Sequence, residues 1–309
     1  MAEKMATRAA YGKALIEIGK ENPNLVVMDA DLSKSTMTNE FSKTFPERFF
    51  NMGIAEQNMY GAAAGLALSG KVVCASTFAM FAAGRAFEII RNSIGYTGAN
   101  VKICATHAGI TVGEDGASHQ TFEDIALMRT IPGMTVVNPS DGVSAEKLMR
   151  QVVAFDGPAY VRLGRAAVPV FYDESEEIQL GKGHVLRQGR DVTVIATGIM
   201  VAEAMMAASQ LAEEGVDVRV IDMHTIKPID EEIIVKAAEE TGKIVTAEEH
   251  SVIGGLGSAV AEVVCRRSPA RIEMIGQQDT YGESGKPEEL KEKYGMTAAD
   301  IVRAVRELY

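Results

Sequence analysis

The chain has 309 residues, too many for one modest hydrophobic core, so two domains are expected. Hydrophobic residues make up 47% and charged residues 24%, as is ordinary for a globular protein, and no apolar run reaches the ~20 residues of a membrane-spanning helix. A net charge of −11 argues against a nucleic-acid partner, which would need a basic face.

The first half of the chain alternates short β-branched runs with helical patterns. Buried strands are predicted at residues 24–32, 71–77, 101–107, 134–140 and 159–164. Helices are predicted at residues 8–20, 56–69, 79–95, 119–130 and 141–154. Alternation at this spacing is typical of β-α-β units and predicts a parallel sheet.

Residues 166–190 interrupt the alternation with a proline, an acidic cluster and three glycines, and are predicted to be a linker. A second series follows, with strands predicted at residues 191–198, 216–223, 243–250 and 271–277 and closing helices at residues 287–295 and 298–309. Pro228 and the acids after it mark a helix start near the first turn. The prediction is an α/β fold of two doubly wound domains, residues 1–165 and 191–309, each a mostly parallel sheet flanked by helices.

The three cysteines, Cys74, Cys104 and Cys265, form neither a CxxC pair nor a Cys/His pattern. They therefore indicate neither a zinc site nor a disulfide framework, and a reducing cytoplasm fits best. The first residues lack the basic and apolar regions of a secretory signal. We expect a cytoplasmic protein without a membrane partner.

Polar residues gather after the strands of the first half. Since ligands of open parallel sheets bind at the carboxyl ends of the strands, the loops there form the candidate site. In chain order these loops contain Asp29, Asp31, Ser33 and Ser35, then Thr77 and Phe78, then His107 and Gly109–Gly116, and finally Arg162 and Arg165.

Glu56 stands at the head of a predicted helix that is otherwise small and apolar (GAAAGLALSG). One interpretation is electrostatic, because an acid in the first turn stabilises a helix by about 0.3–1 kcal/mol. The other is chemical. A helix with so few polar atoms is expected to be packed on all sides, and a buried carboxylate needs a partner or a raised pKa. Such an acid is a candidate to exchange a proton with a ligand, and the residues alone leave both interpretations open.

Two further motifs also allow two interpretations. Phe78 and Phe81 lie at a strand end, where they serve either as core or as a platform for a flat ring. His107 and His119 flank the sequence GEDG and are either ordinary polar residues or functional ones; their spacing matches no metal motif.

Arg165, at another strand end, suits a phosphate or carboxylate but equally a surface ion pair. The glycine-rich segment 251–260 does not complete G-x-G-x-x-G, and tight strand-to-helix packing is predicted there.

Taken in order, these motifs resemble the C-terminal half of transketolase and of its thiamine-diphosphate-dependent relatives. GIAEQN (53–58), STFAMF (76–81) and GEDGASHQ (113–120) form a specific combination, and the resemblance covers nearly the whole chain. It implies a pyrimidine-binding domain with the thiamine-diphosphate-binding fold at residues 1–165 and a transketolase C-terminal domain at residues 191–309. The implied activity is transfer of a two-carbon ketol unit from a ketose phosphate to an aldose phosphate.

The resemblance implies roles for individual residues. Glu56 would hydrogen-bond N1′ of the cofactor aminopyrimidine and favour its imino tautomer. The implied catalytic residues are Glu56, His107 and His119. The implied cofactor contacts are Glu56, Phe78, Phe81 and Asp31. The implied substrate contacts are Arg8, Ser35, His107 and Arg165 at the sugar phosphate, and Asp115 at a substrate hydroxyl. No metal ligand is implied in this chain.

Two positions depart from the family pattern, the first in the wall of the pocket and the second in a segment that bears on substrate choice. Gly84 stands where transketolase usually has a third aromatic residue. The sequence THAG (106–109) combines a histidine typical of transketolase with an AGI segment that resembles deoxyxylulose-phosphate synthase.

The resemblance also implies a missing partner. Thiamine enzymes hold the diphosphate and Mg²⁺ (or Ca²⁺) through a GDG motif and a later Asn on another domain. Neither EDG (114–116) nor FDG (155–157) opens that motif convincingly. An N-terminal transketolase subunit is therefore expected as the partner in an α2β2 heterotetramer. Half of a deoxyxylulose-phosphate-synthase-like enzyme, the β-type subunit of a 2-oxoacid dehydrogenase, and a non-catalytic homologue stay open as alternatives.

Overall fold

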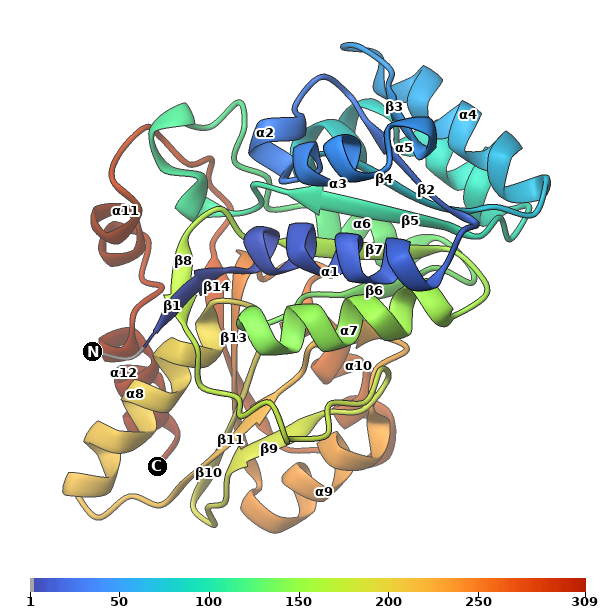
Figure 1. Cartoon of the computed structure of the whole chain (residues 1–309). Coiled ribbons are helices and arrows are strands. Elements are labelled where there is room, and N and C mark those ends of the chain that lie inside the picture. The colour runs from blue at the N-terminus through green and yellow to red at the C-terminus, as the bar shows by residue number, and fades with distance from the viewer. Residues whose placement is uncertain (1–2) are drawn as a thin grey trace.

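The computed structural model describes residues 3–309 (Figure 1). The strands predicted in the first half are confirmed and lie in one seven-stranded sheet of order β12-β6-β7-β5-β4-β2-β3. Its strands are β2 (Leu25–Asp29), β3 (Phe49–Asn51), β4 (Val72–Phe78), β5 (Val101–Thr106), β6 (Thr135–Val137), β7 (Ala159–Leu163) and β12 (Thr225–Lys227). All neighbours are parallel except β12 and β6, so the carboxyl ends of β2, β4, β5 and β7 meet at one edge.

Helices cover both faces of this sheet because alternate strand residues are apolar on each side. Val26 and Met28 pack on the face of α4 (Glu56–Leu68) and α6 (Asp124–Thr130). Leu25 and Val27 pack on the face of α1 (Thr7–Glu21), α3 (Asn39–Thr44) and α7 (Gly142–Ala154). Figure 1 shows α1 and α7 side by side across this second face.

Two predicted helices differ from the structure. The predicted helix 79–95 is divided into the π-helical turns η2 (Phe81–Arg85) and η3 (Ile90–Gly95), with α5 (Phe87–Ile89) between them. The helix predicted at residues 119–130 begins only at Asp124. The helix does not begin earlier because the Glu123 carboxylate accepts hydrogen bonds from Thr121 Oγ1 (2.9 Å) and from the backbone N–H of Phe122 (2.7 Å). These bonds hold residues 121–123 in a bend. The remaining short elements of the first half are β1 (Lys4–Ala6), α2 (Ser33–Thr36), η1 (Pro46–Arg48) and η4 (Ile110–Asp115).

The second half forms a five-stranded sheet of order β14-β13-β10-β11-β9, parallel except for β9. Its strands are β9 (His184–Arg187), β10 (Val192–Ala196), β11 (Val218–Asp222), β13 (Lys243–Ser251) and β14 (Arg271–Gln277). Its helices are α8 (Met200–Glu213), α9 (Glu231–Thr241), α10 (Leu256–Arg267), α11 (Pro287–Lys293) and α12 (Ala298–Leu308). Helices α8 and α12 pack on one face, and α9 and α10 on the other. The α/β class with helices on both faces of mostly parallel sheets is confirmed.

The start of α9 differs slightly from the prediction. Asp230 is its N-cap and accepts the backbone N–H of Ile233 (3.4 Å), so Pro228 precedes the helix. The prediction of tight packing in segment 251–260 is confirmed. The backbone N–H groups of Leu256 and Gly257 donate to the buried Glu248 carboxylate at 2.6 and 2.8 Å.

The two halves exchange elements. The segment predicted as a linker contains β9 and also β8 (Ala167–Pro169), which pairs with β1 near the N-terminus. Strand β12, from the second half, completes the first sheet beside β6 and was not predicted. In return, Ile110 and Phe122 of the first half belong to the hydrophobic core around α8 and α12. The cores around α4 and around α8 and α12 are therefore shared between the halves, whereas the core around α9 and α10 is built from the second half alone.

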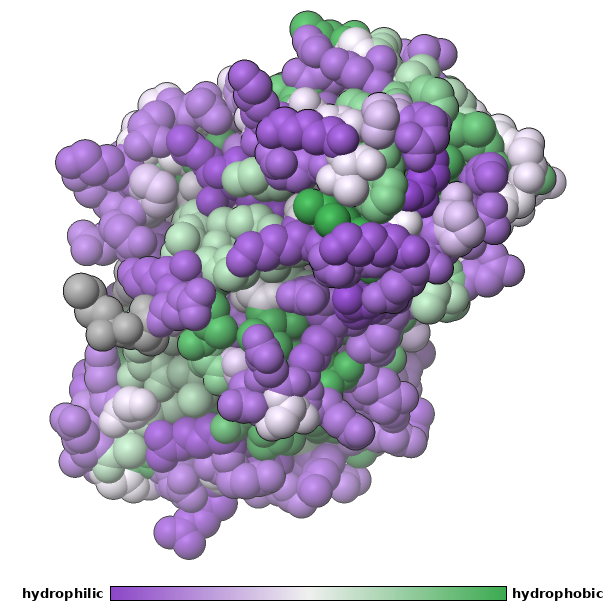
Figure 2. Space-filling model, viewed as in Figure 1, coloured by the Kyte–Doolittle hydropathy of each residue, from purple (hydrophilic) through white to green (hydrophobic). Residues whose placement is uncertain are grey.

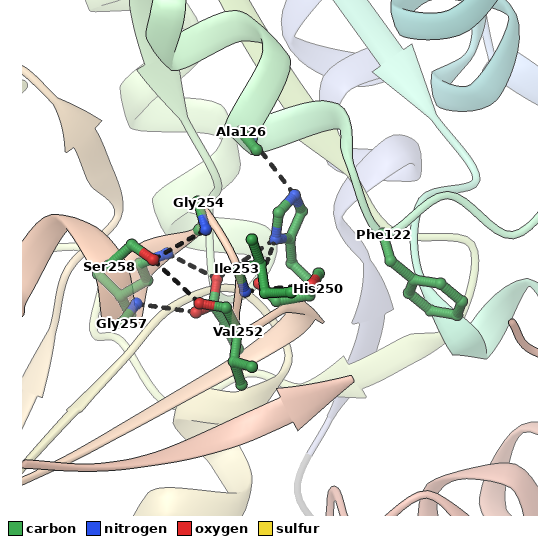
Figure 3. A network of polar contacts seen from close by, with 12 residues as sticks. Phe122, Ala126, His250, Val252, Ile253, Gly254, Gly257 and Ser258 are labelled. Atoms are coloured by element: carbon green, nitrogen blue, oxygen red, sulfur yellow. Dashed lines mark hydrogen bonds and ion pairs between the residues drawn. The ribbon is translucent and has the colours of Figure 1, made fainter. Parts of the chain in front are cut away.

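A polar junction joins the halves next to α6. Figure 3 shows the His250 ring between Ala126 of α6 and the turn that leads through Gly254 to Gly257 and Ser258. The backbone N–H of Ala126 donates to His250 Nε2 at 3.3 Å. Burial lowers the pKa of His250 to about 4, so the ring is neutral near pH 7 and can accept this hydrogen bond.

Candidate active site

The loop after β2 is organised by Asp29, which is fully buried. Its carboxylate accepts hydrogen bonds from the Leu32 backbone N–H (2.5 Å) and from the hydroxyls of Thr36 (2.6 Å) and Thr38 (3.0 Å). Burial raises the pKa of Asp29, although these three donors oppose the shift. The folded loop lines a hollow of about 250 Å³ with residues Asp31–Ser35.

Asp31 and Ser35 are held by this loop. Asp31 has a left-handed backbone with φ +65°, and its exposed carboxylate accepts a hydrogen bond from the side-chain amide of Asn51 at 3.0 Å. The backbone carbonyl of Ser35 accepts a hydrogen bond from Arg8 at 2.6 Å. The structure thus places Ser35 beside Arg8, and Asp31 beside an asparagine that the sequence did not single out.

Glu56 is the first residue of α4 and only 2% exposed. Its Oε2 accepts a hydrogen bond from Arg85 at 2.9 Å, and the Arg85 side chain is 49% exposed. The carboxylate is therefore buried, and its charged partner reaches it from the solvent side. The sequence analysis did not predict Arg85 as a site residue. The signal that could have indicated it is a single cation within the small and apolar stretch that follows Phe81.

The expectation that α4 is packed on all sides is wrong for this chain. Gln57, Gly61, Gly65 and Leu68 are exposed along one face of the helix. A Cβ atom added at Gly61 or Gly65 would meet no atom within 4 Å. Within this chain, the helix buries only the side that faces the sheet.

Two phenylalanines and two histidines form one aromatic cluster. Phe78 stacks on His107 with ring centres 4.0 Å apart and on Phe81 at 5.8 Å. His119 meets Phe78 and Phe81 edge-on at 6.2 and 5.4 Å. The guanidinium of Arg85 lies over the Phe81 ring at 4.7 Å, which connects the cluster to Glu56. Residues from three loops of the sequence thus converge at one sheet edge, as the strand-end rule predicts.

His107 is a strained and buried member of this cluster. Its backbone has φ +58°, which is unusual for a residue other than glycine, and its side chain hydrogen-bonds the Thr106 hydroxyl through Nδ1 at 2.9 Å. Burial, followed by the positive charges of Arg8 and Arg165, lowers the pKa of His107 to about 3. The imidazole is therefore neutral at pH 7.

Two arginines bring positive charge to the same edge. Arg165 donates hydrogen bonds to the Val112 carbonyl and, at 3.0 Å, to the Glu114 carboxylate. Burial and the charge of Arg165 lower the pKa of Arg8. The Nε of Arg8 is buried and has no hydrogen-bond partner within residues 3–309. A pair of close guanidiniums with an unused donor suits an anionic ligand.

Asp115 ends η4 as an exposed residue, and His119 hydrogen-bonds Ser118 at 3.0 Å. The structure therefore joins Phe78, Phe81, His107 and His119 by direct ring contacts. It adds Arg8, Ser35 and Arg165 through hydrogen bonds and charge, and Glu56 through Arg85. Among the described residues, no hydrogen bond or ion pair joins Asp31 or Asp115 to this group, although Asp31 lines the same hollow as Ser35.

Two protein-family models together match nearly the whole length of the chain. The transketolase pyrimidine-binding domain matches residues 3–170, and the transketolase C-terminal domain matches residues 181–301. The chain belongs to the transketolase family. It is a transketolase-type enzyme subunit, and the resemblance drawn from GIAEQN and GEDGASHQ is confirmed.

Known transketolases support this membership. A solved structure titled "Split gene transketolase, inactive beta4 tetramer" matches with a TM-score of 0.93 and 56% identity over 98% of both chains. The 6-deoxy-6-sulfo-D-fructose transketolase subunit of Clostridium sp. (strain MSTE9) is 44% identical over 97% of this chain and 94% of its own. The transketolase of Rattus norvegicus is 38% identical over 99% of this chain but only 49% of its own length. This chain thus corresponds to a subunit of split transketolases and to half of a single-chain one.

The described part of the chain contains no helix long and apolar enough to cross a membrane.

Proposed function

We propose that this chain is the C-terminal subunit of a split, thiamine-diphosphate-dependent transketolase. The enzyme would transfer a two-carbon ketol unit from a ketose phosphate to an aldose phosphate. The observation that carries the proposal is the buried Glu56, placed beside an aromatic cluster and within the same sheet edge as two arginines. Glu56 and the two phenylalanines suit the aminopyrimidine, and the histidines and arginines suit the reacting sugar and its phosphate.

The residues present fit the aminopyrimidine end of the cofactor. Glu56 offers a buried carboxylate whose only charged partner, among the described residues, is the half-exposed Arg85. Because Arg85 can turn to solvent at small cost, Glu56 can share a proton with a ring nitrogen instead. Phe78 and Phe81 supply the flat apolar wall that such a ring needs. Bound thiamine diphosphate would supply the electron sink for carbon–carbon bond cleavage.

The remaining site residues serve the sugar phosphate. Arg8 and Arg165 carry the positive charge for the phosphate, with Ser35 beside Arg8. His107 is neutral and can exchange hydrogen bonds with sugar hydroxyls without adding charge. The exposed Asp115 is assigned to a substrate hydroxyl.

His119 contacts both phenylalanines and is assigned to the reacting centre. It is half-buried at the edge of the aromatic cluster, so its ring can meet a sugar bound over that cluster.

The open face of α4 supports an N-terminal partner subunit. Exposed apolar side chains lie on and beside this helix, namely Phe50, Ile54 and Leu68 at 43%, 79% and 63%. Figure 2 shows hydrophobic residues gathered at the upper right, around the place of α4 in Figure 1. We assign the diphosphate and its Mg²⁺ or Ca²⁺ to a partner docked here, in an α2β2 heterotetramer.

The test is reconstitution. The purified chain alone should bind thiamine diphosphate weakly and show no ketol transfer from a ketose phosphate to an aldose phosphate. Addition of an N-terminal subunit with the GDG motif should produce both tight binding and turnover. Turnover by the chain alone would contradict the split. Turnover with pyruvate instead of a ketose donor would favour the deoxyxylulose-phosphate-synthase alternative.

A further inference from the structure

The second domain holds the loop of the first domain that carries substrate-binding residues. Glu249, on β13, is only 3% exposed, and its Oε1 accepts the backbone N–H of Thr111 at 2.6 Å. Gly109 lies directly against the same carboxylate. A Cβ atom at Gly109 would come within 2.3 Å of Glu249 Cδ, so only glycine permits this approach.

Further contacts fix the same loop from the second domain. Ile110 is fully buried in the core of that domain. Gln120 donates through Nε2 to the carbonyls of Gly113 (3.2 Å) and Glu283 (2.9 Å), and thereby joins the loop to the segment before α11. The start of segment 109–116 is thus held directly by the second domain, and Gly113 is linked to the second-domain residue Glu283 through Gln120.

This loop bears directly on the phosphate-binding arginine. The backbone N–H of Thr111 donates to Glu249. The carbonyl of the next residue, Val112, accepts a hydrogen bond from Arg165, and the Glu114 carboxylate accepts a second one at 3.0 Å. Asp115 follows immediately. A shift of the Thr111 backbone would therefore move both acceptors that orient Arg165.

The charge of Glu249 is compensated within the junction. Arg162 donates through Nη2 to the Glu249 carbonyl (2.7 Å), through Nε to Asp124 (2.9 Å), and lies 3.8 Å from the Glu249 carboxylate. A buried carboxylate that is paired on one side can offer its other oxygen as a strong, fixed acceptor. The junction thus provides an anchor rather than an additional reacting group.

We propose that Glu249 is a positioning residue of the second domain, which sets the 109–116 loop and through it Arg165 for binding of the substrate phosphate. This inference rests on the proposed function, because it takes Arg165 as the phosphate contact. It gives the second domain a part in substrate affinity beyond packing.

The test compares matched carboxylates. Glu248 precedes Glu249 on β13 and is equally buried, but its carboxylate binds Leu256 and Gly257 inside the second domain. Glu249→Ala and Glu248→Ala would each be reconstituted with the N-terminal subunit. Glu249→Ala should raise KM for the phosphorylated ketose about tenfold, the size expected for a lost charge-assisted hydrogen bond, and leave the Kd for thiamine diphosphate within about twofold. Glu248→Ala should leave that KM unchanged.

A second variant and a second readout guard against misfolding. Glu249→Gln keeps an acceptor for Thr111 and should raise KM only about threefold, because a neutral acceptor is weaker. Hydrogen exchange should show faster exchange in residues 109–116 for both Glu249 variants and not for Glu248→Ala. Equal KM in the Glu249→Ala and unmodified enzymes, with equal exchange in the loop, would overturn the proposal.

Failure of the underlying function gives a different result. If Arg165→Ala leaves the KM for the phosphorylated ketose unchanged, the phosphate assignment itself is wrong. If Arg165→Ala raises that KM and the Glu249 variants do not, only the role of Glu249 is wrong.

Discussion

Replacing Glu56 with glutamine removes one charge at the head of α4 and almost nothing else. The Arg85 side chain of the ion pair is 49% exposed. Because solvent screens the charge of Arg85, the ion pair contributes at most about 1 kcal/mol to the free energy of unfolding. Glutamine also keeps an oxygen that can accept the Arg85 hydrogen bond. The free energy of unfolding should therefore change by less than about 1 kcal/mol.

The effect on catalysis should be far larger. Glutamine cannot share a proton with the cofactor ring, and loss of a positioned acid or base typically costs a factor of about 10²–10⁴. The assay is kcat for ketol transfer in the reconstituted enzyme, with thiamine diphosphate binding measured by calorimetry and unfolding by thermal denaturation. Glu88→Gln, an exposed carboxylate on the neighbouring α5, is the matched control. A Glu56→Gln enzyme that binds the cofactor and retains more than a tenth of kcat would refute the proton-sharing role.

Three further predictions concern the substrate, the pH and the partner. Arg165→Ala should raise KM for the phosphorylated ketose about tenfold but not KM for its unphosphorylated analogue, whereas the exposed Arg150→Ala should change neither. The pKa of His107 lies near 3 in the fold against 6.5 normally, so the unfolded chain binds a proton that the folded chain excludes. The free energy of unfolding should therefore fall as pH drops from about 6.5 toward 3, and His107→Asn should flatten this dependence in urea titrations; an unchanged slope would contradict it. Gly61→Trp places its ring in open space, so it should leave the isolated chain folded but prevent assembly with the N-terminal subunit, as size-exclusion chromatography would show. Gln210→Trp, at an exposed position of α8, should assemble normally.

Most of the fold was predictable because its strands are buried on both faces. Runs such as residues 25–29 and 192–196 are mostly apolar and buried at every position, and strands of that kind occur almost only in parallel sheets under helices. The exceptions depend on tertiary contacts. Strand β12 has three residues and pairs with a strand about ninety positions earlier, so no local pattern indicates it. The π-helical turns after Phe78 equally lack a local signal.

The position of the candidate site in the fold was predictable from the sequence, but the contacts between its side chains were not. The strand-end rule brought Phe78, His107 and Arg165 to one edge, because parallel neighbours must end together. The rule says nothing about side-chain partners. Arg85 approaches Glu56 only because the π-helical turn η2 ends at that residue, and Glu249 reaches the site from a strand 138 positions after Thr111. Those contacts need the packed structure.

The exchange of elements between the halves predicts that residues 1–170 will not fold alone. Such a fragment loses β12 from its sheet and exposes Ile110 and Phe122, which are buried in the second domain. Burial of two such side chains contributes about 3–6 kcal/mol, which is comparable with the whole stability of many domains.

Circular dichroism and urea titration of the fragment should show no cooperative transition, whereas the full chain should unfold cooperatively. The double variant Ile110→Ser/Phe122→Ser in the fragment should improve its solubility, because both side chains would then meet water. A fragment 1–170 that unfolds cooperatively without these substitutions would show that the first domain is independent. In that case the loop 109–116 would be fixed before the second domain docks, and its control by Glu249 would have to be weak.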